Sequence, residues 1–137
     1  MNDEKILSQK LNWQDYHNNI DCLSDKIKKS SKFSKYKYIA AFESDDMILA
    51  VHLSHTLGIR FISDISLMTM LLNCSEVERE SILIVSNVVK SGKKFNDIMN
   101  IIKGKSDTAV MYKDMSSTYN VTFYFEKPLN YILFPWQ

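Results

Sequence analysis

A stretch at positions 86–94, SNVVKSGKK, has the residue types that bind phosphate. It follows the apolar run SILIV (81–85) and precedes a segment of helical periodicity, so we expect a strand-to-helix loop here. Gly92 permits a tight turn whose N–H groups face an anion, and a helix N-terminus adds positive charge. Lys93 and Lys94 would oppose the helix dipole at about 0.3–1 kcal/mol each, a cost that a bound phosphate would offset. A solvent-exposed turn with two solubilising lysines is the alternative.

A second polar group, Ser44, Asp45 and Asp46, follows the apolar and aromatic run YKYIAAF at 36–42. Serine is a good N-cap, and acids in the first turn of a helix favour its dipole. The two carboxylates could also hold Mg²⁺. The residues thus predict a capped helix and leave the magnesium interpretation open.

Histidine and cysteine give weaker signals. His52 and His55 lie three positions apart on an expected helix, a spacing that can begin a metal site, but no third ligand is evident. His17 is isolated in the sequence, and no order of Ser, His, Asp and Cys indicates nucleophilic catalysis. Cys22 and Cys74 are far apart and form no C-x-x-C pair, so we expect buried free thiols. We predict no metal centre.

The bulk composition narrows the class of protein. The sequence has 137 residues, enough for one domain over positions 1–137, with 45% hydrophobic and 24% charged residues. Lys plus Arg number 17 and Asp plus Glu 16, a net charge of +1 that argues against a nucleic-acid partner. No apolar run reaches the length of a membrane span, and the first residues are polar. We expect a soluble cytoplasmic protein with no membrane partner.

The elements that must position these residues alternate between strands and helices. In order, we expect a helix over 13–29 with Asn12 as N-cap, a strand over 36–42, a helix over 44–57 that Gly58 ends, strands over 59–62 and 81–85, a helix from Ser91 to Gly104, and strands over 108–112, 121–125 and 131–134. The apolar run at 66–72 fits either a strand or a helix. Apolar strands separated by helices indicate an α/β fold with a mainly parallel sheet flanked by helices. Ligands of such sheets bind where strands lead into helices.

The chain resembles the type I phosphoribosyltransferases, in particular the short xanthine/guanine/hypoxanthine members. The resemblance covers about Trp13 to Gln137, through the segments LNWQDYHNNI, IAAFESDDMILAVHLSHTLGI, ILIVSNVVKSGKKF, VMYKDMSS and YILFPWQ. It implies the three-layer phosphoribosyltransferase-like fold and, by analogy, a dimer. The family's mobile hood corresponds to the short segment 63–80, which we interpret as a trimmed hood or a subunit contact.

The resemblance also implies roles for individual residues. The phosphate loop is Lys90, Ser91, Gly92, Lys93 and Lys94. Ser86 and Asn87 stand where the family has two acids that bind the ribose hydroxyls, and both can still hydrogen-bond a sugar. Lys90 replaces a third acid of the same motif. The purine would be bound by Lys113, by the ring of Tyr131 and by the backbone of Ile132.

The loop that binds pyrophosphate in the family contains Arg-Gly-Gly, and here it is Ser44-Asp45-Asp46. The arginine is lost, and carboxylates repel the anion. We therefore predict a degenerate, weakly active or inactive member that binds a purine nucleotide or phosphate. The alternative is an active purine salvage enzyme that uses phosphoribosyl pyrophosphate with Mg²⁺ as cofactor. A third hypothesis is a structural protein without a ligand.

Overall fold

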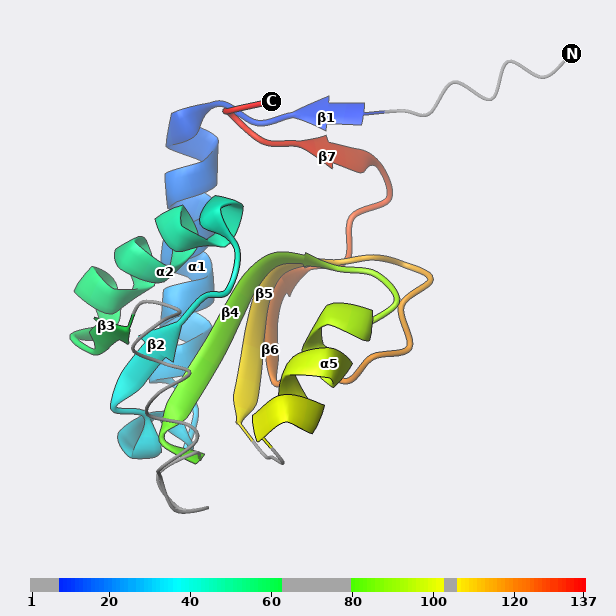
Figure 1. The fold of residues 1–137 in the computed structure, drawn as a ribbon. Coiled ribbons are helices and arrows are strands. Elements are labelled where there is room, and N and C mark those ends of the chain that lie inside the picture. The colour runs from blue at the N-terminus through cyan, green and yellow to red at the C-terminus, as the bar shows by residue number, and fades with distance from the viewer. Residues whose placement is uncertain (1–7, 63–79, 103–105) are drawn as a thin grey trace, which may run out of the picture.

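The computed structural model describes residues 8–62, 80–102 and 106–137. Figure 1 shows the arrangement of the elements. They are β1 (Ser8–Lys10), α1 (Trp13–Lys28), a 3₁₀ turn (Phe33–Lys35), β2 (Tyr38–Ala40), α2 (Ser44–Leu57), β3 (Arg60–Ile62), β4 (Ile82–Val89), α5 (Lys93–Ile102), β5 (Asp107–Lys113), β6 (Phe123–Glu126) and β7 (Tyr131–Leu133).

The main sheet has the strand order β3-β2-β4-β5-β6, and every neighbouring pair is parallel. Helices α1 and α2 cover one face of it, and α5 covers the other (Figure 1). The predicted three-layer α/β fold with a mainly parallel sheet is thus confirmed. The parallel arrangement brings the carboxyl ends of β2, β4 and β5 to one edge, from which α2 and α5 begin.

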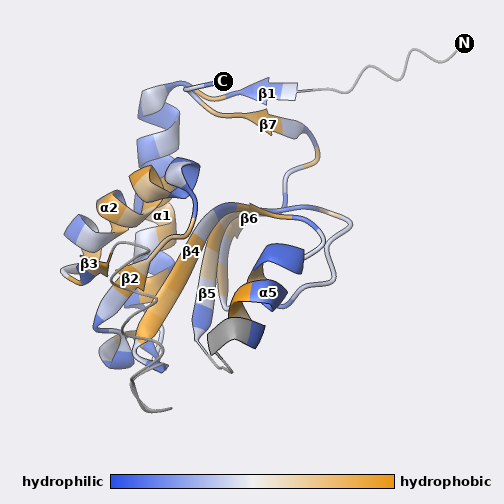
Figure 2. Ribbon diagram, viewed as in Figure 1, coloured by the Kyte–Doolittle hydropathy of each residue, from blue (hydrophilic) through white to orange (hydrophobic). Residues whose placement is uncertain are grey.

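The core is divided between the two faces of the sheet, as strand alternation requires. Leu83 and Val85 of β4 join the cluster under α1 and α2, whereas Ile82 and Ile84 join the cluster under α5. All four side chains are buried, which explains why this strand reads as a continuous apolar run. Figure 2 shows the same concentration of apolar residues along β2 and β4.

The ends of the two long helices follow from local chemistry. The Asn12 side chain accepts a hydrogen bond from the Asp15 N–H at 2.7 Å and caps α1, as expected. Gly58 ends α2 in the left-handed conformation, with φ 67°. Ser44, however, is not the N-cap that we predicted. It is the first residue of α2, the preceding Glu43 occupies the cap position, and that side chain makes no capping hydrogen bond.

Strand β4 is longer than its apolar run. We expected a strand over 81–85 and a loop from Ser86, but β4 continues to Val89, and its pairing with β5 runs from Leu83 to Val89. Ser86 and Asn87 are therefore strand residues, and the turn into α5 is confined to residues 90–92. A loop was expected here because both residues are polar, but their side chains are hydrogen-bonded inside the fold.

Two further expectations change. The strand at the end of the chain does not extend the main sheet: β7 pairs in parallel with β1, a strand that the sequence did not predict, in a separate two-stranded sheet. Cys22 is exposed on α1, not buried. The apolar run at 66–72, Cys74, Gly104 and nearly all of the segment 63–80 lie outside the described residues. Within the described part of the chain, no helix has the length and apolar character needed to span a bilayer.

Candidate functional site

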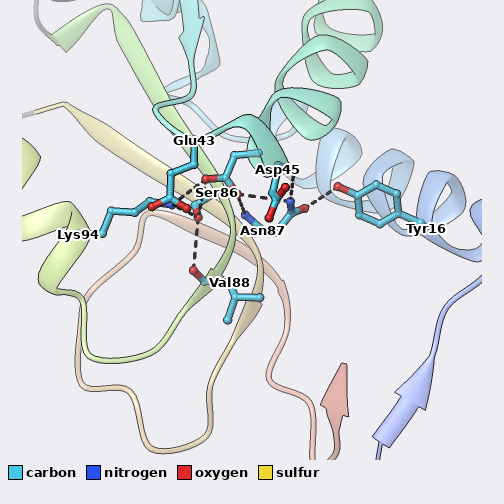
Figure 3. A network of polar contacts seen from close by, with 8 residues as sticks. Tyr16, Glu43, Asp45, Ser86, Asn87, Val88 and Lys94 are labelled. Atoms are coloured by element: carbon cyan, nitrogen blue, oxygen red, sulfur yellow. Dashed lines mark hydrogen bonds and ion pairs between the residues drawn. The ribbon is translucent and has the colours of Figure 1, made fainter. Parts of the chain in front are cut away.

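The carboxyl edge of the sheet brings two turns together: the one from β2 into α2 and the one from β4 into α5. Between them lies a network of polar side chains, which Figure 3 shows from close by. Its centre is Asp46, which lies in the first turn of α2 and is only 3% exposed. A carboxylate so deeply buried must be paired and hydrogen-bonded, and this one is.

Both oxygens of Asp46 are engaged. Oδ1 accepts a hydrogen bond from the backbone N–H of Asn87 at 2.9 Å. Oδ2 accepts one from the ammonium of Lys94 at 2.7 Å and one from the hydroxyl of Ser86 at 3.2 Å. The Lys94 ammonium also donates to Ser86 Oγ at 2.9 Å and lies 3.5 Å from the carboxylate of Glu43. The network thus joins α2, β4 and α5 through one charged pair.

The network reaches α1 through Asn87. The hydroxyl of Tyr16 donates to Asn87 Oδ1 at 2.5 Å, and the Asn87 amide donates to the backbone oxygen of Asp45 at 2.8 Å. Tyr16 is fully buried. Burial, and next the nearby charge of Asp46, raise the pKa of the Tyr16 hydroxyl well above its usual value. The tyrosine therefore remains a neutral donor throughout the physiological range.

The turn at 90–92 forms the rim of a cavity of about 290 Å³. Its lining includes the five residues that the sequence assigned to phosphate, and also Glu43. Gly92 has φ 80°, and a Cβ there would lie 2.4 Å from a ring carbon of Tyr119, so the position requires glycine for both reasons. Ser91 Oγ accepts a long hydrogen bond, 3.3 Å, from the Lys93 N–H. The geometry suits a small anion against the N-terminus of α5.

The two lysines at the start of α5 differ in their surroundings. The Lys93 side chain is exposed beside the cavity. Lys94 is half-buried, and its ammonium is directed to Asp46, Ser86 and Glu43. The positive charge that the sequence placed at the phosphate loop is therefore partly neutralised from inside the protein.

A second cavity, of about 240 Å³, lies between the ends of β4 and β5 and the C-terminal segment. Tyr131 and Ile132 both line it, together with Lys90. The Lys90 ammonium lies 5.3 Å from the centre of the Tyr131 ring and makes a cation–π contact with it. Tyr131 is 47% exposed. Lys90 lines both cavities, so it links the loop to this aromatic pocket.

Lys113 is not among the residues that line this second cavity. Its ammonium lies 5.9 Å from the centre of the Tyr124 ring on β6. The structure therefore brings Tyr131, Ile132 and Lys90 together at this cavity, while Lys113, which pairs with Val89 in the sheet, does not line it. Ser86 and Asn87 are 1% and 4% exposed, and their side chains are engaged within the protein.

The carboxylates at the start of α2 do not form a joint metal site in this arrangement. Asp45 is exposed, whereas Asp46 is buried and holds Lys94. Among the described residues, no group of three His, Cys, Asp or Glu side chains is placed to hold a metal ion. His17 is not isolated: its ring centre lies 5.1 Å from that of His52, whose Nε2 is 2.8 Å from Asp21 Oδ1.

Sequence reasoning missed several members of the site. The sequence does not distinguish Tyr16 from the other apolar positions of α1, and nothing in it marks Glu43 as part of the site. The pairing of Asp46 with Lys94 joins residues 48 positions apart and could have been suggested only by the predicted adjacency of the two turns. The contact between Lys90 and Tyr131 had no sequence signal.

The three-layer fold and the loop at the carboxyl edge of β4 define a protein with the type I phosphoribosyltransferase fold. A purine phosphoribosyltransferase from Pyrococcus horikoshii is 18% identical, with a TM-score of 0.71 over 95% of this chain and 93% of that chain. A hypothetical protein from Neisseria gonorrhoeae with bound ppGpp is 18% identical, with a TM-score of 0.76 over 97% and 90% of the two chains. The xanthine-guanine-hypoxanthine phosphoribosyltransferase of Helicobacter pylori is 15% identical, with a TM-score of 0.72 over 94% and 92%.

At these identities the likeness establishes the fold, and the resemblance read from the sequence is confirmed at that level. No protein-family model and no curated protein matches the sequence. The chemistry must therefore be argued from the residues of this chain.

Proposed function

We propose that this protein binds a purine nucleotide, or a related phosphorylated ligand, at the carboxyl edge of its sheet and transfers phosphoribose poorly or not at all. The observation that carries the proposal is the buried pair of Asp46 and Lys94. A carboxylate of the protein occupies the start of α2, where the resemblance implies pyrophosphate, and it engages a lysine that the resemblance assigns to phosphate. The fold is retained, but the protein's own carboxylate occupies one of the two anion sites that the resemblance implies.

Binding of a single phosphate is supported by the cavity at the 90–92 turn. Gly92 permits the left-handed backbone of the turn, and Lys90 and Lys93 line the cavity. Neither lysine has a carboxylate within ion-pair distance among the described residues. Two cations at a helix N-terminus, neither within 4.0 Å of a described carboxylate, favour an anion at this place.

Binding of pyrophosphate is disfavoured by charge. One carboxylate and one phosphate charge 4 Å apart repel by about 4 kcal/mol at an effective dielectric of 20. Glu43, Asp45 and Asp46 place three carboxylates at this turn, and Lys94 offsets the charge of only one of them. Stabilisation of a pyrophosphate leaving group would need positive charge here. This is why we propose binding without efficient transfer.

The purine is best accommodated in the aromatic pocket. The exposed Tyr131 ring can stack on a base, and Ile132 offers backbone groups to its edge. Lys90, at the junction of the two cavities, can donate to a base or to a phosphate. We propose that Ser86 and Asn87 shape the site from inside β4, since their side chains are already hydrogen-bonded within the protein.

The alternative function is an active purine salvage transferase, favoured by the names of two of the solved structures. Such an enzyme would require Mg²⁺ with phosphoribosyl pyrophosphate. We place either function in the cytoplasm, and a homodimer remains an expectation from the resemblance alone.

Two measurements separate the hypotheses. Pyrophosphate release is measured with Mg²⁺, phosphoribosyl pyrophosphate and each purine base, and thermal shifts are measured with GMP, IMP, AMP, ppGpp and inorganic phosphate. We expect stabilisation by at least one nucleotide, about 2.7 kcal/mol at a ligand concentration of 100 Kd, with no release. Turnover of about 1 s⁻¹ or faster would refute the proposal and support the transferase. Folded protein that no nucleotide or phosphate stabilises would support the ligand-free hypothesis.

A set of variants tests the location of the phosphate. Lys93→Ala should abolish the nucleotide shift with little change in stability, since its side chain is exposed. Lys37→Ala removes the same charge beside Ser81, at the opposite end of the sheet, and should leave the shift intact. Glu43→Gln removes a negative charge from the cavity and should tighten binding by about two- to fivefold. Equal shifts in all three variants would place the ligand elsewhere.

A further inference from the structure

The C-terminal segment forms one wall of the aromatic pocket. The residues of this wall that line the cavity are Tyr131, Ile132, Phe134 and Gln137. None of them belongs to the main sheet. Among the described strands β7 pairs with β1 alone, in a two-stranded sheet that Figure 1 shows apart from the larger one. The wall on which a base would stack therefore depends on a strand near the other end of the chain.

Strand pairing and the core together hold only part of this wall. Both strands have three residues, and all of β1 is exposed. A two-stranded sheet on its own is marginally stable at best in water. The core holds the buried side chains of Ile132 and Phe134, but the Tyr131 side chain is exposed and its residue pairs with Ser8. A further contact between β1 and the C-terminal segment would fix the stacking ring.

Lys10, the last residue of β1, makes that contact. Its ammonium donates to the backbone oxygen of Phe134 at 2.9 Å and also to the backbone oxygen of Gln137. The Gln137 side chain closes the same turn, because its Oε1 accepts from the Phe134 N–H at 3.0 Å. Hydrogen bonds from a charged donor are stronger than those between neutral groups. One side chain thus connects β1 to two residues that lie 124 and 127 positions away in the sequence.

We infer that Lys10 is a positioning residue for the purine, which holds the C-terminal wall so that the Tyr131 ring is in place to stack on the base. The inference rests on the proposed function, because it takes the aromatic pocket as the site of the base. Lys10 itself is not among the residues that line this pocket or the cavity at the 90–92 turn. A wall that is closed for only part of the time lowers the apparent affinity in proportion to the closed fraction. Loss of Lys10 should therefore weaken the binding of a nucleotide and leave the binding of phosphate alone unchanged.

The test replaces Lys10 with methionine, which has a similar length and no donor. Isothermal titration calorimetry measures the Kd of inorganic phosphate and of GMP, IMP or AMP, whichever binds the wild type most tightly. We expect Lys10→Met to weaken nucleotide binding about three- to tenfold and to keep the Kd of phosphate within about twofold. Lys28→Met is the matched control, because it removes the same charge from an exposed position in the last turn of α1 and should match the wild type for both ligands. Lys10→Arg, which can donate to both oxygens, should restore nucleotide binding.

A second measurement follows the wall without any ligand. Hydrogen exchange detected by mass spectrometry should be faster over residues 131–137 in Lys10→Met than in the wild type, while β4 and β5 exchange at the wild-type rate. This pattern would show local opening of the wall in a protein whose main sheet is intact. If Lys10→Met does not fold, Lys10→Gln, which keeps a donor group on a shorter side chain, takes its place in both measurements.

The possible results separate this inference from the proposed function. A wild-type protein that binds no nucleotide contradicts the proposed function, and the inference fails with it. If the wild type binds a nucleotide and the folded Lys10 variant binds it equally tightly, the inference alone is overturned. It is also overturned if the affinities for nucleotide and phosphate fall together, or if residues 131–137 exchange at the wild-type rate.

Discussion

The substitution Asp46→Asn probes the buried pair of Asp46 and Lys94 at the start of α2. An amide is nearly isosteric with the carboxylate, but it has one acceptor oxygen where Asp46 uses two. If that oxygen stays with the Asn87 N–H, the new NH₂ group faces the ammonium of Lys94. The charge-assisted hydrogen bond at 2.7 Å is then lost. Lys94 would retain Ser86 and the more distant Glu43.

The magnitude follows from these contacts. A hydrogen bond to a charged group contributes about 1.5–3 kcal/mol, and an unpaired buried charge raises the cost of losing it to about 3–5 kcal/mol. The side chain of Lys94 is 30% exposed, so water recovers part of the loss. We therefore expect Asp46→Asn to lower the free energy of unfolding by about 2–4 kcal/mol, a large part of the usual 5–15 kcal/mol.

Urea unfolding at pH 7 measures the effect, and the neighbouring Asp45→Asn is the control. Asp45 is exposed and contributes mainly through the helix dipole, at about 0.3–1 kcal/mol. The reasoning is refuted if Asp46→Asn costs less than about 1 kcal/mol or no more than Asp45→Asn. Unequal slopes of the unfolding curves would signal a changed unfolded state and would require a second denaturant.

Three further outcomes are expected. Gly92→Ala should destabilise the fold by about 2–4 kcal/mol in urea, because φ 80° is strained for alanine and its Cβ would meet Tyr119, whereas Gly58→Ala, with open space around it, should cost about 1–2 kcal/mol. Burial alone would raise the pKa of Asp107, but its tyrosine and lysine partners outweigh burial and hold the pKa below its usual value. The stabilisation from these partners is therefore present above about pH 4 and is lost as pH falls through the lowered pKa. Urea titrations from pH 6 to pH 2 should show that loss in the wild type and not in Asp107→Asn. The raised pKa values of Tyr16, Tyr36 and Tyr112 mean that stability falls above about pH 10. Tyr16→Phe should remove its own share of that alkaline slope while costing about 1 kcal/mol at pH 7.

The fold was predictable because its strands are buried on both faces. β4 and β5 contain continuous apolar runs instead of alternating apolar and polar residues, and this pattern can be recognised without knowing which strands lie beside them. The two-stranded sheet was not predictable, because β1 is the exposed tripeptide SQK whose only evidence is its pairing with β7. The end of β4 was misjudged for a related reason, since Ser86 and Asn87 are polar by residue type and buried by virtue of distant partners.

The residues of the site were found to different degrees. The turn with Gly92 and the acids at α2 could be located, because glycine and charge mark such places locally. Their partners could not, because a hydrogen bond between Tyr16 and Asn87 joins positions 71 apart and depends on the packing of α1 against the sheet. For the same reason Lys94 was read as a free cation, although its ammonium belongs to Asp46.

The charges at positions 44–46 and at positions 86 and 87 differ from those that the resemblance implies. By resemblance, acids would stand at positions 86 and 87 and an anion-binding loop at positions 44–46. Here positions 86 and 87 are neutral and donate to a carboxylate at position 46. Lys94 pairs with the protein's own carboxylate at the start of α2. The carboxylate of Asp46 stabilises the junction of α2, β4 and α5 through hydrogen bonds from Ser86, Asn87 and Lys94. If the proposed function holds, this pair both stabilises the fold and disfavours pyrophosphate, so a variant that removes the pair should lose stability and repel pyrophosphate less.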